Sequence, residues 1–406
     1  MQSQRSRFFI TSLLGALSVI SPFAIDMYLP AYLQVARDFN VASQVISLTL
    51  SSYFIGLAGG QIFYGPLLDR FGRKKPLSIG LVIFILASIG CALSTNIYML
   101  VAFRFLQALG GCGAQVASLA MVRDFFPVKD NARILSSLFL FIAISPLLAP
   151  TIGGFVMLLF SWRAVFFILM VIVAAILLLI HFWLPEAHIP DRSISLRAKP
   201  IILEYISILK NPSFATYAFA GAFSFAGLFT YVAGSPIIFM ENFHLTPKAY
   251  SLIFALLAGG FIGGSQINIF LLRKYESRQL FAFFLFVQVL TALIFTAGSW
   301  IDCYGLIATL ILFFIALSCA GITYPNAAAM AMAPFSKNTG SAAALLGFIQ
   351  LGTGALISSG ISLFPTHSSF PIIAILGVTS AMGLCVMLAG STRAKAIPKT
   401  GEGLFD

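Results

Sequence analysis

Two ionisable residues lie in stretches that are otherwise apolar. Asp26 is part of the string AIDMYLP, and Arg104 is the first residue of the string RFLQALGG. A charge at the centre of a membrane costs roughly 2.5 to 3.5 kcal/mol on insertion scales, so each residue needs a partner or a watery cavity. An acid in such a place can bind and release a proton as its surroundings change, and a nearby cation affects that exchange. We therefore predict that Asp26 and Arg104 couple the protein's activity to proton binding and release.

The elements that carry these residues are predicted to be membrane-spanning helices. Hydrophobic residues make up 59% of the 406, enough for about twelve spans of roughly 20 residues each. Charged residues make up only 9%, against roughly 25% in soluble domains, which excludes a soluble enzyme. We therefore expect an all-α membrane protein with twelve transmembrane helices, near 8–32, 43–66, 76–95, 98–122, 134–160, 164–184, 213–240, 248–272, 279–299, 304–328, 340–364 and 370–391.

The basic residues predict the orientation of these spans. A net charge of +11 would suit a nucleic-acid binder if it formed one stripe, but the basic residues are spread over the gaps between apolar runs, so we expect no nucleic-acid partner. If the N-terminus is cytoplasmic, the outer gaps hold only Arg37, Arg163 and Lys248, and most other basic residues lie in the inner gaps. The positive-inside rule then places both termini in the cytoplasm.

Asp26 and Arg104 lie at matching depths in this topology. Asp26 is four residues before Pro30 at the outer end of the first span, and Arg104 is six residues after Tyr98 at the outer end of the fourth. At ~1.5 Å per residue, both lie roughly 6 to 9 Å from the outer ends. Asp26 is the only acid, and Arg104 the only base, that this assignment places well inside a span. The alternative is that both extend to the outer interface, which suits arginine better than a short aspartate.

The longest polar gap, 185–211, divides the spans into two sets of six. From Ser195 onward its apolar spacing is helical, which predicts an amphipathic helix on the inner membrane face. LLDRFGRK at 67–74 and LLRKYESR at 271–278 both follow the second span of their half. We expect an N-terminal half (1–184), a cytoplasmic linker (185–211), a C-terminal half (212–391) and a cytoplasmic tail (392–406). Two related halves are typical of transporters whose substrate site lies between them.

The string GPLLDRFGRKK, from 65 to 75, resembles the loop between spans two and three of the major facilitator superfamily. A basic inner loop would explain Arg73 by charge topology alone, but not the acid Asp69. The resemblance implies that Asp69 meets the N-terminus of the eleventh span, near Thr339, where exposed N–H groups and the helix dipole favour an anion. It also implies that Arg73 reaches Asp124. The residues assigned to gating are Gly65, Asp69, Arg70, Gly72, Arg73 and Asp124.

Two further strings narrow the resemblance. RFLQALGG is similar to the superfamily's Arg-x-x-Gln-Gly pattern, with Ala108 where many members have glycine. APTIGG, from 149 to 154, resembles the Gly-Pro-x-x-Gly-Gly signature of proton antiporters, with Ala149 in place of the first glycine. Small residues and a proline also permit close helix packing and bending, so a purely structural role stays open. The resemblance implies an antiporter motif at Pro150, Gly153 and Gly154.

Polar side chains within the spans are candidates for a substrate cavity. Gln115 shares a helical face with Arg104 and would extend a polar strip towards the middle of the protein. An apolar, aromatic cavity with one acid and one arginine favours small amphiphilic drugs over sugars, which need many hydrogen-bonding side chains. The cavity candidates are Tyr28, Tyr53, Gln115, Tyr231, Asn268, Tyr324, Asn326 and Gln350.

Four strings, DMYLP, RFLQALGG, MVRDFF and SWRAVFF, together resemble the Bcr/CflA group of drug exporters, and the resemblance extends from residue 8 to about 391. It implies proton-driven efflux of drugs such as bicyclomycin, chloramphenicol or florfenicol across the bacterial inner membrane. An exporter of an endogenous metabolite or siderophore fits every motif equally, whereas an importer usually lacks the signature at 149–154. We expect a monomer in the lipid bilayer that binds protons and drug.

Neither an enzyme nor a metal site is indicated. The four histidines are scattered at or near span ends, with no acid or cysteine at ligand spacing. The five cysteines fall in or beside apolar runs without paired spacing, so we expect no disulfide framework. We therefore predict no catalytic residues, no metal and no cofactor.

Overall fold

The structure is a computed structural model that describes residues 4–186, 190, 198–335, 339–364 and 368–395. Every regular element in this part of the chain is helical, and twelve of the segments are long and apolar enough to cross a membrane. The predicted all-α fold with twelve spans is therefore confirmed. The linker residues 187–189 and 191–197 and the tail residues 396–406, for which we predicted a cytoplasmic location, lie outside the described residues.

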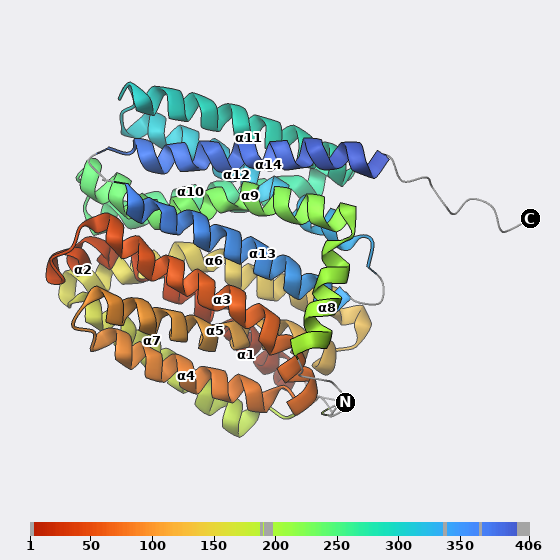
Figure 1. Cartoon of the computed structure of the whole chain (residues 1–406). Helices are drawn as coiled ribbons and strands as arrows, with labels where there is room; N and C mark the ends of the chain where they lie inside the picture. The colour runs from red at the N-terminus through yellow and green to blue at the C-terminus, as the bar shows by residue number, and fades with distance from the viewer. Residues whose placement is uncertain (1–3, 187–189, 191–197, 336–338, 365–367, 396–406) are drawn as a thin grey trace, which may run out of the picture.

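The helices form two groups, one from each part of the chain (Figure 1). The first group contains α1 (Gln4–Asp26), η1 (Leu29–Ala31), α2 (Tyr32–Asp38), α3 (Ser43–Phe71), α4 (Lys74–Ala92), α5 (Ile97–Phe125), α6 (Val128–Leu159) and α7 (Trp162–Trp183). The second contains α9 (Pro212–Pro236), η2 (Ile237–Asn242), α10 (Pro247–Leu271), α11 (Ser277–Trp300), α12 (Leu306–Met332), α13 (Thr339–Ser359), η3 (Gly360–Leu363) and α14 (Phe370–Lys395). Between them, α8 (Ala198–Leu209) lies across the end of the bundle that carries both termini (Figure 1). We call this the linker end and the opposite one the far end.

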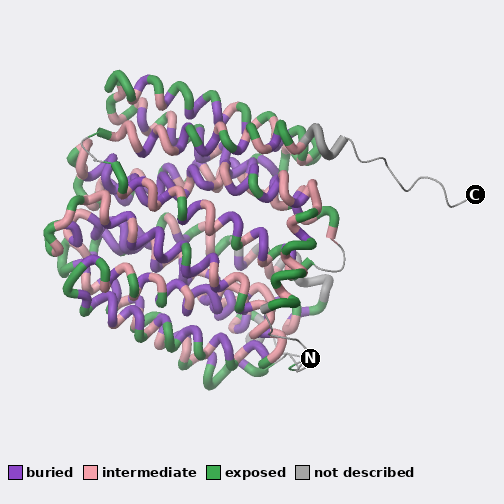
Figure 2. The backbone as a smooth tube through the Cα atoms, viewed as in Figure 1, coloured by how far each residue is buried: buried purple, intermediate pink, exposed green. Residues whose placement is uncertain are grey.

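Buried residues lie between the helices, and exposed residues lie on the outside of the bundle (Figure 2). The larger buried cluster contains residues of both groups, such as Tyr28 and Phe54 from the first and Phe229 and Phe254 from the second. Large apolar side chains such as Leu159 are exposed on the outer surface. An apolar outer surface is expected where hydrocarbon surrounds the helices, because lipid chains cannot hydrogen-bond polar side chains. The backbone polar groups are satisfied within each helix.

Several helix boundaries differ from those expected, and the end of α3 is one of them. α3 continues to Phe71, so the motif residues from Gly65 to Arg70 are helical and only Gly72 and Arg73 connect α3 to α4. The expectation of a loop from 65 to 75 was therefore wrong for its first part. Gly72 ends α3 with a φ of +83°, a conformation that glycine adopts without strain.

The first and seventh spans are also longer than predicted. The first continues through η1 and α2 to Asp38, and the seventh continues through the π-helix η2 to Asn242. The longer seventh span includes Glu241, whose Oε2 is buried without a hydrogen-bond partner. Glu241 therefore lies one residue before the end of the seventh span, just beyond the predicted range 213–240.

Candidate transport site and gates

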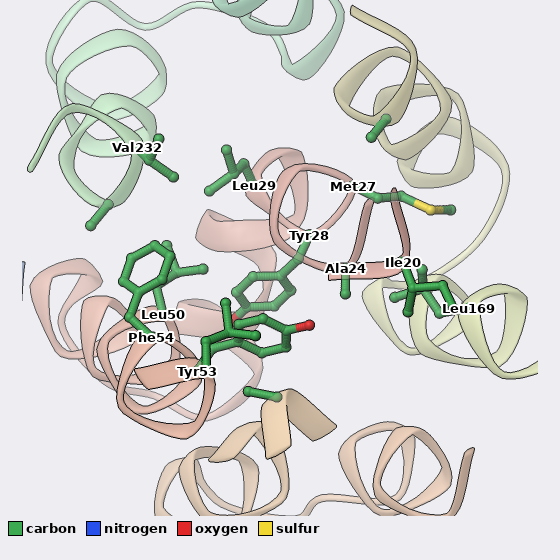
Figure 3. Packing of buried hydrophobic residues seen from close by; sticks show 14 of the residues in the cluster. Ile20, Ala24, Met27, Tyr28, Leu29, Leu50, Tyr53, Phe54, Leu169 and Val232 are labelled. Carbon is green, nitrogen blue, oxygen red and sulfur yellow. The ribbon is translucent and has the colours of Figure 1, made fainter. Parts of the chain in front are cut away.

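Arg104 is completely buried on α5 and is surrounded by aromatic rings. Its Nη1 donates to the carbonyl oxygen of Ala24 (3.1 Å) and to Oε1 of Gln107 (2.7 Å). The guanidinium carbon lies 4.3 Å from the ring centroid of Tyr53 and 5.0 Å from that of Tyr28, within the range of cation–π attraction. Figure 3 shows these two rings next to one another between their helices. Nε and Nη2 are buried and have no hydrogen-bond partner among the described residues.

Asp26 ends α1 and is only 7% exposed. The Ala24 carbonyl that Arg104 binds lies two residues before Asp26 in α1. Within the described residues, however, no ion pair joins Asp26 to Arg104. The side chains that interact electrostatically with Asp26 are Tyr231 on α9 and Tyr250 on α10, both from the second group of helices. Arg104 thus binds the backbone of the helix that ends at Asp26, but the two predicted side chains are not joined in this state.

A short hydrogen-bond chain leads from Arg104 to α4. Gln107 accepts from Arg104 through Oε1 and donates through Nε2 to Oγ of Ser88 (2.8 Å). Ser88 in turn donates to the carbonyl of Phe84 (2.7 Å). Gln107 belongs to the string RFLQALGG, but Ser88 was missed because a lone serine in an apolar span gives no sequence signal.

The residues of the antiporter motif lie where α6 meets both groups of helices at the far end. A Cβ on Gly153 would lie 2.2 Å from the carbonyl oxygen of Met27, so only glycine permits this approach to the backbone that follows α1. Ser251 on α10 donates to the carbonyl of Pro150 (2.8 Å), and a Cβ on Gly154 would lie 2.9 Å from the same hydroxyl. The motif therefore connects the two groups of helices through α6 and α10.

A second contact between the groups joins α3 to α13. The hydroxyls of Ser51 and Ser358 are 2.9 Å apart and buried. The rings of Phe54 and Phe229 meet edge to face nearby, with centroids 4.5 Å apart. The hydrogen bonds of Ser251 with Pro150 and of Ser51 with Ser358 both lie on the far-end side of the bundle. The structure is therefore closed at the far end.

At the linker end, Arg73 binds two acids of the first group. Its Nε donates to Asp124 Oδ2 (2.8 Å), the contact implied by the family resemblance, and its Nη1 pairs with Asp69. Burial lowers the pKa of Arg73 and the two carboxylates raise it, and the net shift is upward. The guanidinium therefore stays charged and ties α3 to α5.

Glu186 completes this cluster and was not predicted. Its carboxylate accepts hydrogen bonds from the backbone N–H groups of Arg73 (2.9 Å) and Lys74 (3.1 Å) at the start of α4, where an anion is favoured. Lys74 Nζ donates to the carbonyls of His181 (2.9 Å) and Leu184 (3.0 Å) at the end of α7. These contacts join the linker ends of α4 and α7.

In the part of the chain that the structure describes, Asp69 does not make the expected contact with α13. α13 begins at Thr339 as predicted, but within the described residues Asp69 is hydrogen-bonded to Arg73, and its side chain is 45% exposed. The gating residue Arg70 lies over the ring of Phe71, at 5.7 Å. Gly65 has nothing within 4 Å of where a Cβ would lie, so packing does not require glycine there.

The candidate cavity residues do not form one cluster. Tyr28, Tyr53 and Tyr231 are buried around Arg104 and Asp26. Asn326 donates to Asn268 (2.6 Å) near the linker ends of α12 and α10, away from Arg104. The others lie apart from this pair: Tyr324 against the ring of Phe225 (4.3 Å), Gln115 half-buried on α5, and Gln350 buried on α13.

Two bundles of membrane-spanning helices, with buried ionisable groups where they meet, define the architecture of a secondary transporter. The comparisons with known proteins agree with this class. The chain belongs to the Major Facilitator Superfamily, whose family model matches residues 14–359. This confirms the family predicted from the sequence, and it makes the protein a transporter and not an enzyme.

Several bacterial relatives match most of the chain. It is 33% identical over 384 residues to an uncharacterized MFS-type transporter of Bacillus subtilis, YdgK, covering 93% of this chain and 94% of the relative. It is 29% identical over 395 residues to a bicyclomycin resistance protein homolog of Haemophilus influenzae, covering 96% of each. It is 32% identical over 348 residues to the multidrug resistance protein MdtL of Escherichia coli, covering 85% and 86%. The protein is therefore related to drug-resistance transporters.

Solved structures share the fold. A D-xylose–proton symporter superposes with a TM-score of 0.72 at 16% identity, covering 98% of both chains. A bacterial homolog of the human lysosomal transporter Spinster, in an inward-facing and unoccupied conformation, gives a TM-score of 0.70 at 13% identity, covering 96% of both. At these identities the similarity establishes the fold alone.

Proposed function

We propose that the protein exports small amphiphilic drugs in exchange for protons by alternating access. The observation that carries the proposal is the buried Arg104, whose Nε and Nη2 are unpaired although the backbone that it binds leads directly to Asp26. A buried cation without an acidic partner is costly, and an aspartate nearby can supply the missing charge by losing a proton. A protonated Asp26 leaves Arg104 on its neutral partners, and an ionised Asp26 attracts it.

This exchange can be linked to the movement of the two halves. Asp26 belongs to the first half, but the hydroxyls around it, Tyr231 and Tyr250, belong to the second. Opening the far end would move these hydroxyls away and admit water, so Asp26 could exchange protons with the outside. In the closed state it would carry its proton until the linker end releases it. One proton that crosses 100 mV releases ~2.3 kcal/mol, which sustains roughly a 40-fold drug gradient.

The proposed orientation places the linker end in the cytoplasm of a bacterial cell and the far end outside its inner membrane. The support is the concentration of basic residues in the inner gaps. The hydrogen bonds of Ser51 and Ser251 then hold a state closed to the outside. We assign Arg73, Asp69 and Asp124 to the inner gate, where Asp69 would exchange Arg73 for the N-terminus of α13 when the linker end closes.

The proposed substrates are amphiphilic molecules of drug size. The support is the aromatic surroundings of Arg104 and Asp26, together with relatives that are named for bicyclomycin resistance and multidrug resistance. Aromatic walls accept many shapes, and one acid with one arginine provides few of the hydrogen bonds that a sugar requires. We propose that the transporter acts as a monomer.

The test is expression in a host that lacks its major efflux pumps, with susceptibility measured across a chemically varied drug panel. The wild-type protein should raise tolerance to at least one amphiphilic drug, and Asp26→Asn should remove that protection while the protein still reaches the membrane. Asp302→Asn is the matched control, because Asp302 is exposed and its φ of 50° is one that asparagine tolerates.

Proteoliposomes that contain the purified protein then measure drug-driven proton flux directly. Wild-type proton coupling in Asp26→Asn would overturn the assignment of Asp26. If the inserted wild-type protein protects against no compound, the drug-export proposal fails, and an endogenous metabolite becomes the better candidate substrate.

A further inference from the structure

The hydrogen-bond chain from Phe84 through Ser88 and Gln107 to Arg104 has only one possible direction. Ser88 carries a single hydroxyl proton, which it gives to the carbonyl of Phe84 (2.7 Å), so its oxygen can only accept from Gln107. The Gln107 amide must therefore present Nε2 to Ser88 (2.8 Å) and Oε1 to Arg104 (2.7 Å). If the amide turned over, its NH₂ would face the guanidinium, and donor would oppose donor.

We infer that Ser88 is a positioning residue for proton coupling: it fixes the Gln107 amide, which holds Arg104 away from a full ion pair with Asp26. The inference rests on the proposed function of Asp26 and Arg104. Ser88 contacts neither of these residues in the hydrogen bonds of the structure and acts only through Gln107. All three members of the chain, Ser88, Gln107 and Arg104, are completely buried, so water does not replace a lost partner freely.

The consequence concerns the competition for Arg104. With the Gln107 carbonyl fixed, Nη1 stays on neutral acceptors, and an ionised Asp26 must compete with them for the cation. Without the Ser88 hydroxyl, the amide can rotate and Arg104 becomes more available to the carboxylate. An ionised Asp26 is then favoured, and its proton is released at lower pH. The other ionisable side chains around the two charges are Tyr28, Tyr53, Cys91, Tyr231 and Tyr250.

The test needs no drug. In purified protein in lipid nanodiscs, infrared difference spectroscopy follows the C=O stretch of a protonated buried carboxyl group as the pH is changed. The Asp26 band is the one that disappears in Asp26→Asn. We expect Ser88→Ala to move the midpoint of this band by about one unit to lower pH, a tenfold weaker proton affinity. Ser88→Thr keeps the hydroxyl and should restore the wild-type midpoint.

Ser118→Ala is the matched control. Ser118 is a buried serine on the same helix as Arg104, and its hydroxyl bonds the carbonyl of Gln115 in its own helix (2.8 Å). Its removal should leave the midpoint unchanged. If Ser88→Ala does not fold, Gln107→Met tests the same chain, because it removes the carbonyl from Arg104 and must shift the midpoint in the same direction.

Two negative results have different meanings. An unchanged midpoint in folded Ser88→Ala, with a clear Asp26 band, would overturn the role of Ser88 and leave the proposed function intact. If no Asp26 band titrates in the wild-type protein, the proton-coupling proposal and this inference are both overturned.

Discussion

The serine hydrogen bonds across the far end should determine how often that end opens. Ser251→Ala removes the bond to the carbonyl of Pro150, and Ser358→Ala removes the bond to Ser51. Ser51 keeps a second bond to the carbonyl of Ser47 (3.1 Å), so Ser358→Ala does not leave the Ser51 hydroxyl without a partner. Each substitution should favour the open state, in which water can replace these contacts.

The magnitude follows from the net value of a neutral buried hydrogen bond, about 1 kcal/mol. Each single substitution should raise the ratio of open to closed far ends about fivefold. The two bonds lie on different helix pairs, α6 with α10 and α3 with α13, so their effects should add. The double variant should therefore shift the ratio about thirtyfold, which corresponds to about 2 kcal/mol.

Pulsed electron–electron double resonance between two spin labels measures this ratio from the distribution of distances between them. Ala42 and Lys248 are exposed far-end positions in opposite halves, and labels there report their separation once the exposed Cys303 and Cys385 are replaced by serine. Ser380→Ala is the control, because the Ser380 hydroxyl bonds only the carbonyl of Leu376 in its own helix (2.8 Å). An unchanged distance distribution in the double variant would show that these bonds do not hold the far end closed.

Two further predictions concern the motifs. Gly153→Ala should open the far end in the same labelling experiment and lower drug transport about tenfold, because its Cβ would meet the backbone of Met27 at 2.2 Å, and such overpacking costs typically 1–3 kcal/mol. Transport at the wild-type level would refute this. Asp69→Asn should slow transport strongly while the drug dissociation constant in equilibrium binding stays within about threefold, because Asp69 lies at the linker end beside Arg73. An equal loss of affinity would contradict a gating role.

The twelve spans could be predicted because each membrane helix needs an uninterrupted apolar run of roughly 20 residues. The contact of Arg73 with Asp124 was also expected, from the family resemblance. Glu186 could not be found in the same way, because its carboxylate meets backbone N–H groups 112 residues earlier in the chain, and backbone partners leave no pattern of residue types.

Two other differences arise from local geometry and from the conformational state. The π-helix η2 extends the seventh span past the apolar run, so an assignment from hydropathy ends just before Glu241. The sequence spacing predicted that Asp26 and Arg104 lie at the same depth in the membrane. Depth alone does not determine which acceptor the guanidinium of Arg104 binds. In this structure it binds the Ala24 carbonyl and Gln107. That choice depends on protonation and on the state of the gates, which a sequence does not specify.

The capping of α4 by Glu186 also determines what the connection between the halves can do. Glu186 is fixed to the first half, while α8, which begins at Ala198, packs against α9 and α13 of the second. Twelve peptide units separate these two points in the sequence, which limits the distance between them to roughly 40 Å. The covalent connection gives each half a high effective concentration for the other. Two separately synthesised halves should therefore still associate, but with a lower apparent affinity.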